Sequence, residues 1–285
     1  MEVKTPTTID EQIQKIESRG CVVNDEEYAR EILYKVNYYR LTAYFLPFKK
    51  ANGDYIKNLT FERVYNIYEF DKKLRGIIFP IIEGIEVALR FQISYYHAHK
   101  YGALGYESES NFNKTHMHYK FEERINRMIY INKNQKFVKH HLTKYNGKFP
   151  IWVIIELFSM SELSIFYSDL IDNDKRYIAN TYFNTTHECL SSWLYCLTLI
   201  RNNCAHYSPL YYNIFHATPK NEKNQPYDLS NKLFDYIYVL KLLYRNIGNW
   251  NTELFIPLQA LIEKYADDIN LKHINFSDNW SELLK

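Results

Sequence analysis

Residues 185–209 read TTHECLSSWLYCLTLIRNNCAHYSP, a stretch that combines a helix start, an apolar stripe and a helix end. Its apolar side chains recur at the spacing i, i+4, i+7 and i+11: Trp193, Leu197, Ile200 and Cys204. Thr185 followed by Glu188 is typical of a capping box, and Ser208-Pro209 disfavours helix beyond that point. The pattern predicts one helix from about 186 to about 207.

Three polar residues near the end of this predicted helix carry the chemistry that RNA cleavage needs. Arg201 can hold a phosphate through two hydrogen bonds and stabilise the charge that develops on it. His206 can transfer a proton near neutral pH, and a place in the last helical turn favours the imidazolium. Asn202 adds a polar group beside the arginine. An Arg-x-x-x-x-His pattern occurs by chance in many proteins, so its flanks decide how specific it is.

The spacing of Arg201 and His206 limits how the two side chains can act together. Five residues place them roughly 140° apart around a regular helix. One helix therefore cannot easily direct both groups at one phosphate. Either the last turn is distorted, or two chains each supply part of the site across a two-fold interface. Both arrangements stay open, and the second predicts a homodimer.

A second polar row is predicted on one face of an earlier helix. Its members fall within about 60° of one another at 100° per residue: Glu83, Glu86, Arg90 and His97. The row is either a solvated face with a favourable Glu86–Arg90 pair, or a border of the active site that orients Arg201.

The motif Arg201-Asn202-Asn203-Cys204-Ala205-His206 closely resembles the signature of abortive-infection proteins of AbiD/AbiF type, which belong to the HEPN superfamily of helical RNases. Other segments resemble the same family in the same order: NYYRLTAY (37–44), YEFDKKLR (68–75), EGIEVALR (83–90), PIWVIIE (150–156) and LS (163–164). Met160 stands where the family often has glycine. Tyr207-Ser208-Pro209 replaces the more usual basic or small residues after the motif.

The resemblance implies an all-α, HEPN-like helical bundle with additional N- and C-terminal helices. It implies a metal-independent endoribonuclease toxin with Arg201, His206 and Asn202 as catalytic residues, which cleaves cellular or phage RNA on infection. Some relatives are paired with a small non-coding RNA antitoxin. The candidate supporting residues are those of the polar row: Glu83, Glu86 and Arg90.

Composition sets independent limits on RNA binding. The 285 residues carry a net charge of only +2, so RNA contact requires local basic patches. Candidate RNA-binding residues are Arg40, Lys136, Lys139 and Lys144, and Lys72-Lys73 with Arg75 form a further basic cluster. Solvated helix faces explain these lysines equally well. The 27 tyrosines either pack in the core with a wet hydroxyl or stack on unpaired bases.

Strand signals are scarce, and the sequence predicts one all-α domain over residues 1–285. Helices are expected near 119–131, 135–145 and 231–247. Predicted caps of further helices are Thr8, Asn24 or Asp25, Thr60, Ser161 and Thr252. Pro80 is expected to kink or split the helix that follows Thr60.

No cofactor and no metal site is expected. The four cysteines form no Cys-x-x-Cys pair, and His97-x-His99 and His116-x-His118 are expected to be ordinary surface histidines. Met1-Glu2-Val3-Lys4 leads into polar residues rather than a signal peptide, and apolar runs are too short to span a bilayer. A cytoplasmic protein without a membrane partner is therefore expected.

Three functions fit these observations. The leading one is an RNA-cleaving toxin. The second is an RNA-binding module without catalysis, bound and regulated by a small RNA. The third is a structural bundle in which Arg201 and His206 only cap a helix end, as basic residues commonly do.

Overall fold

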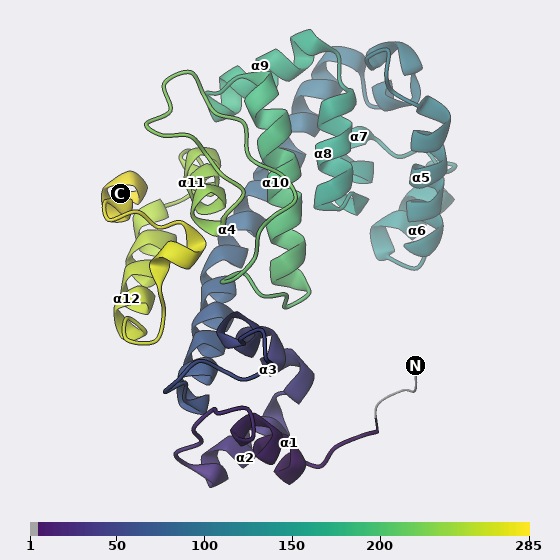
Figure 1. Ribbon diagram of the computed structural model, residues 1–285. Helices are drawn as coiled ribbons and strands as arrows, with labels where there is room; N and C mark the ends of the chain where they lie inside the picture. Colours follow the sequence, from purple (N-terminus) through teal and green to yellow (C-terminus); the bar gives the residue numbers. More distant parts are fainter. Residues whose placement is uncertain (1–4) are drawn as a thin grey trace.

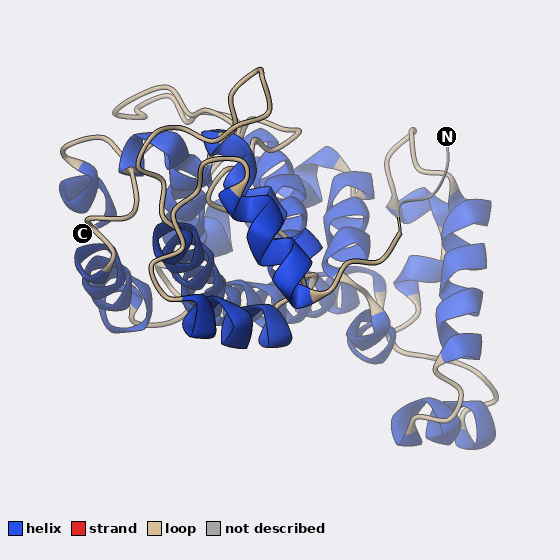
Figure 2. Cartoon of the chain, turned by 60° about the horizontal axis from the view of Figure 1, so that its bottom comes forward, coloured by secondary structure: helices blue, strands red, loops and turns tan. Residues whose placement is uncertain are grey.

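The computed structural model describes residues 5–285, and every regular element in that range is a helix (Figures 1 and 2). The predicted all-α fold is confirmed. Residues 1–4, on which the absence of a signal peptide was argued, lie outside the described residues. The helices are α1 (Ile9–Glu17), α2 (Glu26–Lys35), α3 (Tyr38–Phe45), α4 (Phe61–Tyr101), α5 (His118–Ile131), α6 (Lys136–Lys144), α7 (Ile151–Ile154), α8 (Met160–Asp169), α9 (Asp172–Phe183), α10 (His187–Ala205), α11 (Leu233–Tyr244), α12 (Ile256–Lys264) and α13 (Trp280–Leu284).

The long helix α4 is the axis on which the other helices pack (Figure 1). It contacts α3 and each helix from α7 to α12. Thr60 caps it as predicted, because its hydroxyl accepts a hydrogen bond from the Arg63 amide at 3.2 Å. Of the two outcomes expected for Pro80, a kink or a split, the split is wrong, because α4 continues through Pro80 to Tyr101. Pro80 and Gly76 are both exposed, so the Gly76 carbonyl that loses its helical partner is open to water.

Two predicted helix starts are displaced by one or two residues. Thr186, not Thr185, caps α10, and its hydroxyl accepts from the Cys189 amide at 3.2 Å. Thr185 belongs to the end of α9, since its amide donates to the Ala179 carbonyl. Ser159, not Ser161, caps α8 in a capping box with Glu162. In both cases a neighbouring hydroxyl residue has the extended backbone that a cap requires.

Most of the other local predictions are confirmed, and one predicted cap is wrong. The Thr8 capping box and the Asp25 cap are confirmed, as are helices α5, α6 and α11. Thr252 caps nothing, because residues Asn251–Phe255 form a π-helical turn that runs into α12. Helices α3, α9 and α13 were not expected from the sequence patterns.

The buried apolar side chains form one cluster that reaches from Ile13 to Leu284. Large tyrosines such as Tyr44, Tyr167 and Tyr236 lie inside it. That the whole chain forms one domain stays a prediction. Among residues 5–285, no helix is both long enough and apolar enough to cross a membrane.

His97 lies inside this core rather than on the surface, so the expectation of a surface histidine is wrong. Its ring packs against the rings of Tyr101, Phe112 and Phe166, at centroid distances of 5.0 to 6.1 Å. Neither ring nitrogen has a hydrogen-bond partner among the described residues. Burial disfavours the charged ring and lowers the pKa of His97 to about 4.

We expect the protein to lose stability as the pH falls from about 6.5 to about 4. In that window the unfolded chain takes up a proton on this histidine, whereas the native chain does not. The unfolded state therefore binds more protons, and folding weakens by up to about 3 kcal/mol as the pH falls. Urea unfolding of His97→Leu should lack this part of the pH dependence, and His99→Ala, on the exposed side of α4, should retain it. An unchanged pH profile in His97→Leu would show that other groups are responsible.

Candidate active site at the end of α10

Helix α10 ends in a tight turn that sets the position of His206. The helix stops at Ala205, and His206 follows it as the C-terminal cap instead of lying in the last turn as predicted. Tyr207 adopts a left-handed backbone with φ of +58°. The amide of Ser208 donates to the Asn203 carbonyl at 2.9 Å, and that of Tyr207 to the Cys204 carbonyl at 3.3 Å. This is a Schellman turn, in which tyrosine occupies the position that glycine usually fills.

A buried carboxylate holds the segment after this turn. Asp71, on α4, is fully buried and accepts hydrogen bonds from the Leu210 amide at 3.0 Å and the Tyr211 amide at 2.9 Å. The Tyr44 hydroxyl donates to the same carboxylate at 2.5 Å. Burial raises the pKa of Asp71, and Arg75 and the other donors oppose that rise because they favour the carboxylate.

Two arginines reach the same segment from other helices. Arg75 pairs with Asp71 and donates to the Ser208 carbonyl at 3.2 Å. Arg75 is buried, so its predicted place in a surface basic cluster is wrong. Arg40, on α3, donates to the Tyr207 carbonyl at 2.8 Å. The backbone beyond His206 is thus fixed by α3 and α4 together.

His206 and Arg40 line one surface pocket of about 250 Å³. Tyr39, Tyr207 and the turn residues form the remaining walls. The His206 side chain is exposed and makes no hydrogen bond among the described residues, so both ring nitrogens are free to meet a ligand. The structure therefore brings a predicted RNA-binding arginine to the predicted catalytic histidine, although 166 positions separate them in sequence.

Arg201 faces a different set of neighbours on α4. Its Nε lies 3.7 Å from Glu86 Oε2, too far for a hydrogen bond, and this buried nitrogen has no partner among the described residues. Glu86 accepts from Arg90 at 2.5 Å, and Arg90 also donates to the Phe158 carbonyl at 2.7 Å. Glu86 is thereby held beside the Arg201 guanidinium.

The polar row on α4 is accordingly not a uniform solvated face. Glu86 and Arg90 are largely buried and His97 is fully buried, so that interpretation is wrong for these three. Glu83 is exposed and makes no ion pair or hydrogen bond among the described residues. Glu86 lies beside Arg201 and pairs with Arg90, and Glu83 is exposed on the same helix.

Within one chain, no hydrogen bond or ion pair among the described residues joins Arg201 to His206. Asn202 is half-buried and its side chain makes no hydrogen bond there. Neither Arg201 nor His206 donates from its side chain to the carbonyls that end α10. A capping role for the two side chains therefore has no support in the geometry.

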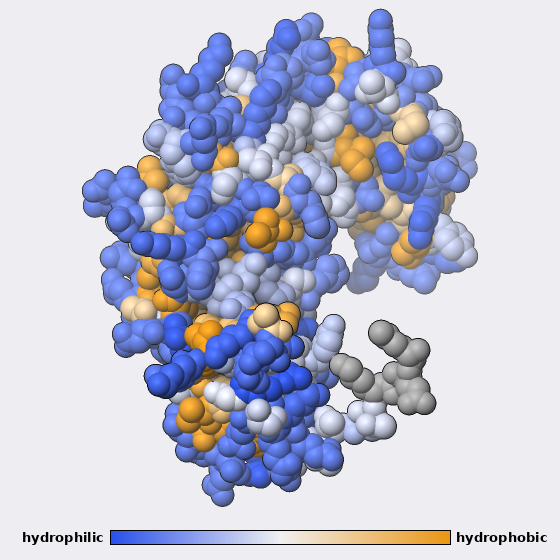
Figure 3. All heavy atoms as spheres, in the orientation of Figure 1, coloured by the Kyte–Doolittle hydropathy of each residue, from blue (hydrophilic) through white to orange (hydrophobic). Residues whose placement is uncertain are grey.

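The other predicted RNA-binding residues lie elsewhere. Lys136, Lys139 and Lys144 are exposed on α6, which stands with α5 to one side of the helices around α4 (Figure 1). The surface is hollowed between this part and the N-terminal helices (Figure 3). None of the three lysines makes an ion pair among the described residues.

Possible metal ligands are not gathered. Across residues 5–285, no three His, Cys, Asp or Glu side chains are arranged to hold a metal ion. His116 is buried instead of lying on the surface as expected. Its Nδ1 lies 2.8 Å from Asp169 Oδ2 and its Nε2 lies 3.2 Å from His118 Nδ1.

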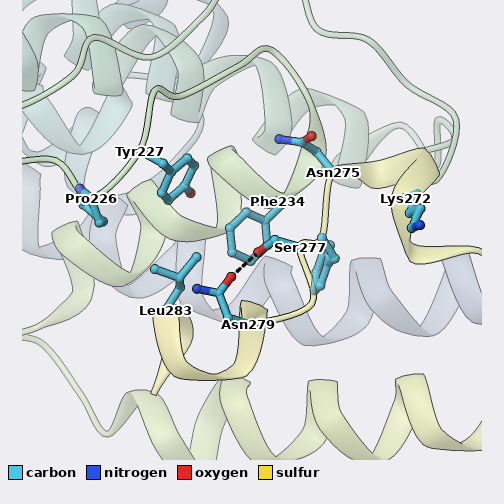
Figure 4. A pocket seen from close by; sticks show the side chains of 9 residues that line it. Pro226, Tyr227, Phe234, Lys272, Asn275, Ser277, Asn279 and Leu283 are labelled. Atoms are coloured by element: carbon cyan, nitrogen blue, oxygen red, sulfur yellow. Dashed lines mark hydrogen bonds between the residues drawn. The ribbon is translucent and has the colours of Figure 1, made fainter.

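Another pocket, of about 400 Å³, lies in the C-terminal helices (Figure 4). Tyr227, Phe234 and Lys272 line it, and the Ser277 hydroxyl donates to Asn279 at 2.7 Å on its wall. None of its lining residues belongs to the motif, and Lys272 is its only charged side chain.

A comparison with known proteins identifies the family. The family model for Abi-like proteins matches residues 31–212, which include α3, most of the core helices and the whole Arg201–His206 motif. No curated protein and no solved structure matches the chain. The match points to abortive infection as the biological setting, and it covers well over half of the sequence. The chain belongs to the family of Abi-like proteins.

Proposed function

We propose that this protein is a metal-independent endoribonuclease of HEPN type that acts in the cytoplasm during abortive infection. The observation that carries the proposal is the exposure and the neighbours of the two motif side chains, Arg201 and His206. His206 is exposed in a pocket beside Arg40, and Arg201 keeps a buried nitrogen without a partner next to Glu86. The Arg201 side chain is 30% exposed, and an arginine can hold an RNA phosphate through its terminal nitrogens.

The proposed reaction takes its nucleophile from the substrate. The ribose 2′-oxygen forms a bond to the adjacent phosphorus as its proton passes to a base, the bond to the 5′-oxygen breaks, and that oxygen takes up a proton. His206 serves as base or acid. Arg201 stabilises the negative charge on the phosphorane, and Asn202 positions the ribose or the histidine. In this proposal Arg40, which lines the same pocket as His206, contacts the same phosphate or its neighbour.

A two-chain site explains why Arg201 and His206 have different neighbours within one chain. Helix α10 is packed against α4, α8, α9 and α11, and its exposed positions include Tyr195 in its middle and His206 just beyond its C-terminal end. On α4, the apolar side chains of Val87, Phe91 and Tyr95 are exposed at the spacing of one helix face. Val87 lies about 40° from Glu83 around the helix, so this stripe adjoins the polar row. Exposed stripes of this kind mark interaction sites, and a second copy is the proposed occupant.

A second candidate is an RNA-binding module that is regulated by a small non-coding RNA and has no catalysis of its own. The basic surface of α5 and α6 favours it. Residues 111–150 contain nine lysines and arginines against two glutamates, in a chain whose net charge is +2. RNA binding and RNA cleavage are compatible, so this candidate differs from the first only in the absence of cleavage.

We expect the purified protein to cleave unstructured RNA in excess EDTA, and to leave 2′,3′-cyclic phosphate or 3′-phosphate ends with 5′-hydroxyls. These ends follow from attack by the 2′-hydroxyl. Enzymatic end-labelling before and after phosphatase treatment distinguishes them from 5′-phosphate ends. A strict requirement for a divalent ion, or 5′-phosphate products, would exclude the proposed reaction. Tight RNA binding without cleavage would favour the second candidate.

A further inference from the structure

A separate pocket of about 360 Å³ lies beside the end of α6, away from the motif residues. Its walls include Tyr145, His141 and Lys148 from the end of α6 and the turn after it, and Trp152 from α7. Trp152 and Tyr145 are about half exposed, at 52% and 47%. Two aromatic rings thus border an open apolar space of nucleobase size.

Backbone hydrogen bonds fix the walls of this pocket. The Gly147 amide donates to the His141 carbonyl at 3.1 Å, and the Lys148 amide to the Tyr145 carbonyl at 3.0 Å. Gly147 has φ of +74°, which glycine adopts without strain. On the other wall, the Ile151 amide donates to the Ala103 carbonyl at 2.8 Å. The pocket is therefore preformed, which reduces the entropy lost when a ligand binds.

The polar groups of the pocket suit a nucleotide. His141 Nδ1 lies 2.8 Å from the Phe137 carbonyl oxygen, so Nδ1 is the donor in that hydrogen bond. Nε2 of the neutral ring is then an acceptor that can receive a hydrogen bond from a base. Lys148, at the pocket, and Lys144, one turn away, are exposed cations that can contact phosphates.

Cations lie over exposed rings at both ends of α6. Lys133 lies over the Tyr130 ring at 4.4 Å, and Lys144 over the Tyr145 ring at 5.6 Å. Single-stranded nucleic acids bind to surfaces of this type, because the cations follow the phosphates and the rings stack on the bases. A duplex keeps its bases stacked on one another and cannot use such rings.

We propose that the pocket between Tyr145 and Trp152 binds an unpaired base of single-stranded RNA, with Lys144 and Lys148 on the flanking phosphates. The inference rests on the proposed function only for the choice of RNA as ligand, since it requires no cleavage. In this proposal the α5–α6 surface binds an unpaired RNA strand at a place separate from the Arg201–His206 motif.

The test measures binding alone, in a His206→Ala background. Fluorescence anisotropy of a labelled oligouridine of about 12 nucleotides, a length that single-strand sites cover, gives the dissociation constant. Trp152→Ala and Tyr145→Ala are each expected to weaken binding about tenfold or more, and Trp152→Phe to stay within about threefold of the parent. Tyr177→Ala on α9, equally exposed, should leave binding unchanged. Lys148→Ala should lower the slope of log affinity against log salt.

The proposal is overturned if Trp152→Ala and Tyr145→Ala bind oligouridine as tightly as the parent. It is also overturned if duplex RNA or polyglutamate competes as well as oligouridine, because the surface would then respond to charge or shape alone. Binding that depends on Trp152 in a protein that does not cleave RNA would support this inference and refute the proposed reaction.

Discussion

Replacing His206 by alanine is expected to abolish RNA cleavage and toxicity while leaving the fold intact. Loss of a general acid or base lowers the rate by about 100-fold or more. The His206 side chain is exposed and makes no hydrogen bond, so its removal should cost at most about 1 kcal/mol of folding free energy. Growth after tightly controlled induction and RNA integrity measure the effect. His99→Ala is the matched control, since His99 is an exposed histidine in the last turn of α4.

Arg201→Ala is expected to give the same loss of cleavage for a different reason, because it removes the positive charge that stabilises the phosphorane. Arg30→Ala, which removes an exposed arginine paired with Asp10, should remain active. Thermal melts verify that the variants fold. If Arg201→Ala or His206→Ala stays fully toxic, or if both variants unfold, the assignment of these residues is wrong.

The second large effect is expected at Asp71, where Asp71→Asn should destabilise the protein by about 3–5 kcal/mol, the usual cost of breaking a buried ion pair. The substitution leaves the Arg75 charge buried without its partner and weakens the hydrogen bonds to the Leu210 and Tyr211 amides. Urea unfolding measures the change. Cleavage should fall as well, since this carboxylate holds the segment after His206.

The control for Asp71 is an ion pair on the same helix whose lysine is exposed. Lys72 pairs with Glu69 at 3.0 Å, and its side chain is 58% exposed. Lys72→Ala should therefore change stability by only about 0.5 kcal/mol. Equal effects of Asp71→Asn and Lys72→Ala would show that the Asp71 cluster does not hold the segment.

Local sequence rules predicted the starts of α1 and α4, and for α2 they left Asn24 and Asp25 as alternatives. Thr8, Asp25 and Thr60 begin helices as expected, because an N-terminal cap depends on a few neighbouring residues. The same rules placed the starts of α8 and α10 one or two residues away from the observed starts. At each start two hydroxyl residues lie close together, and either could serve as the cap by the local pattern alone. The local rules also did not predict that α4 continues through Pro80, where the Gly76 carbonyl that loses its helical partner is open to water.

The candidate site was only partly predictable. Arg201 and His206 stand out through their place after an apolar stripe, but Asp71 looks like any acidic residue on a helix surface. Only the folded structure brings its carboxylate within hydrogen-bonding distance of the Leu210 and Tyr211 amides. The left-handed backbone of Tyr207 carries no local signal either. The sequence contains one indirect indication of this backbone: the chain must turn between α10 and Pro209, and no glycine is present there to make the turn.

We propose that two chains complete the site, with Arg201 from one chain and His206 from the other. The direct measurement is RNA cleavage by an equimolar mixture of Arg201→Ala and His206→Ala chains, co-expressed so that they can pair. Half of the dimers are then mixed, and each mixed dimer keeps one intact site of two, so about a quarter of the wild-type activity should return. A mixture as inactive as either variant alone, beside an active wild type, would contradict the claim.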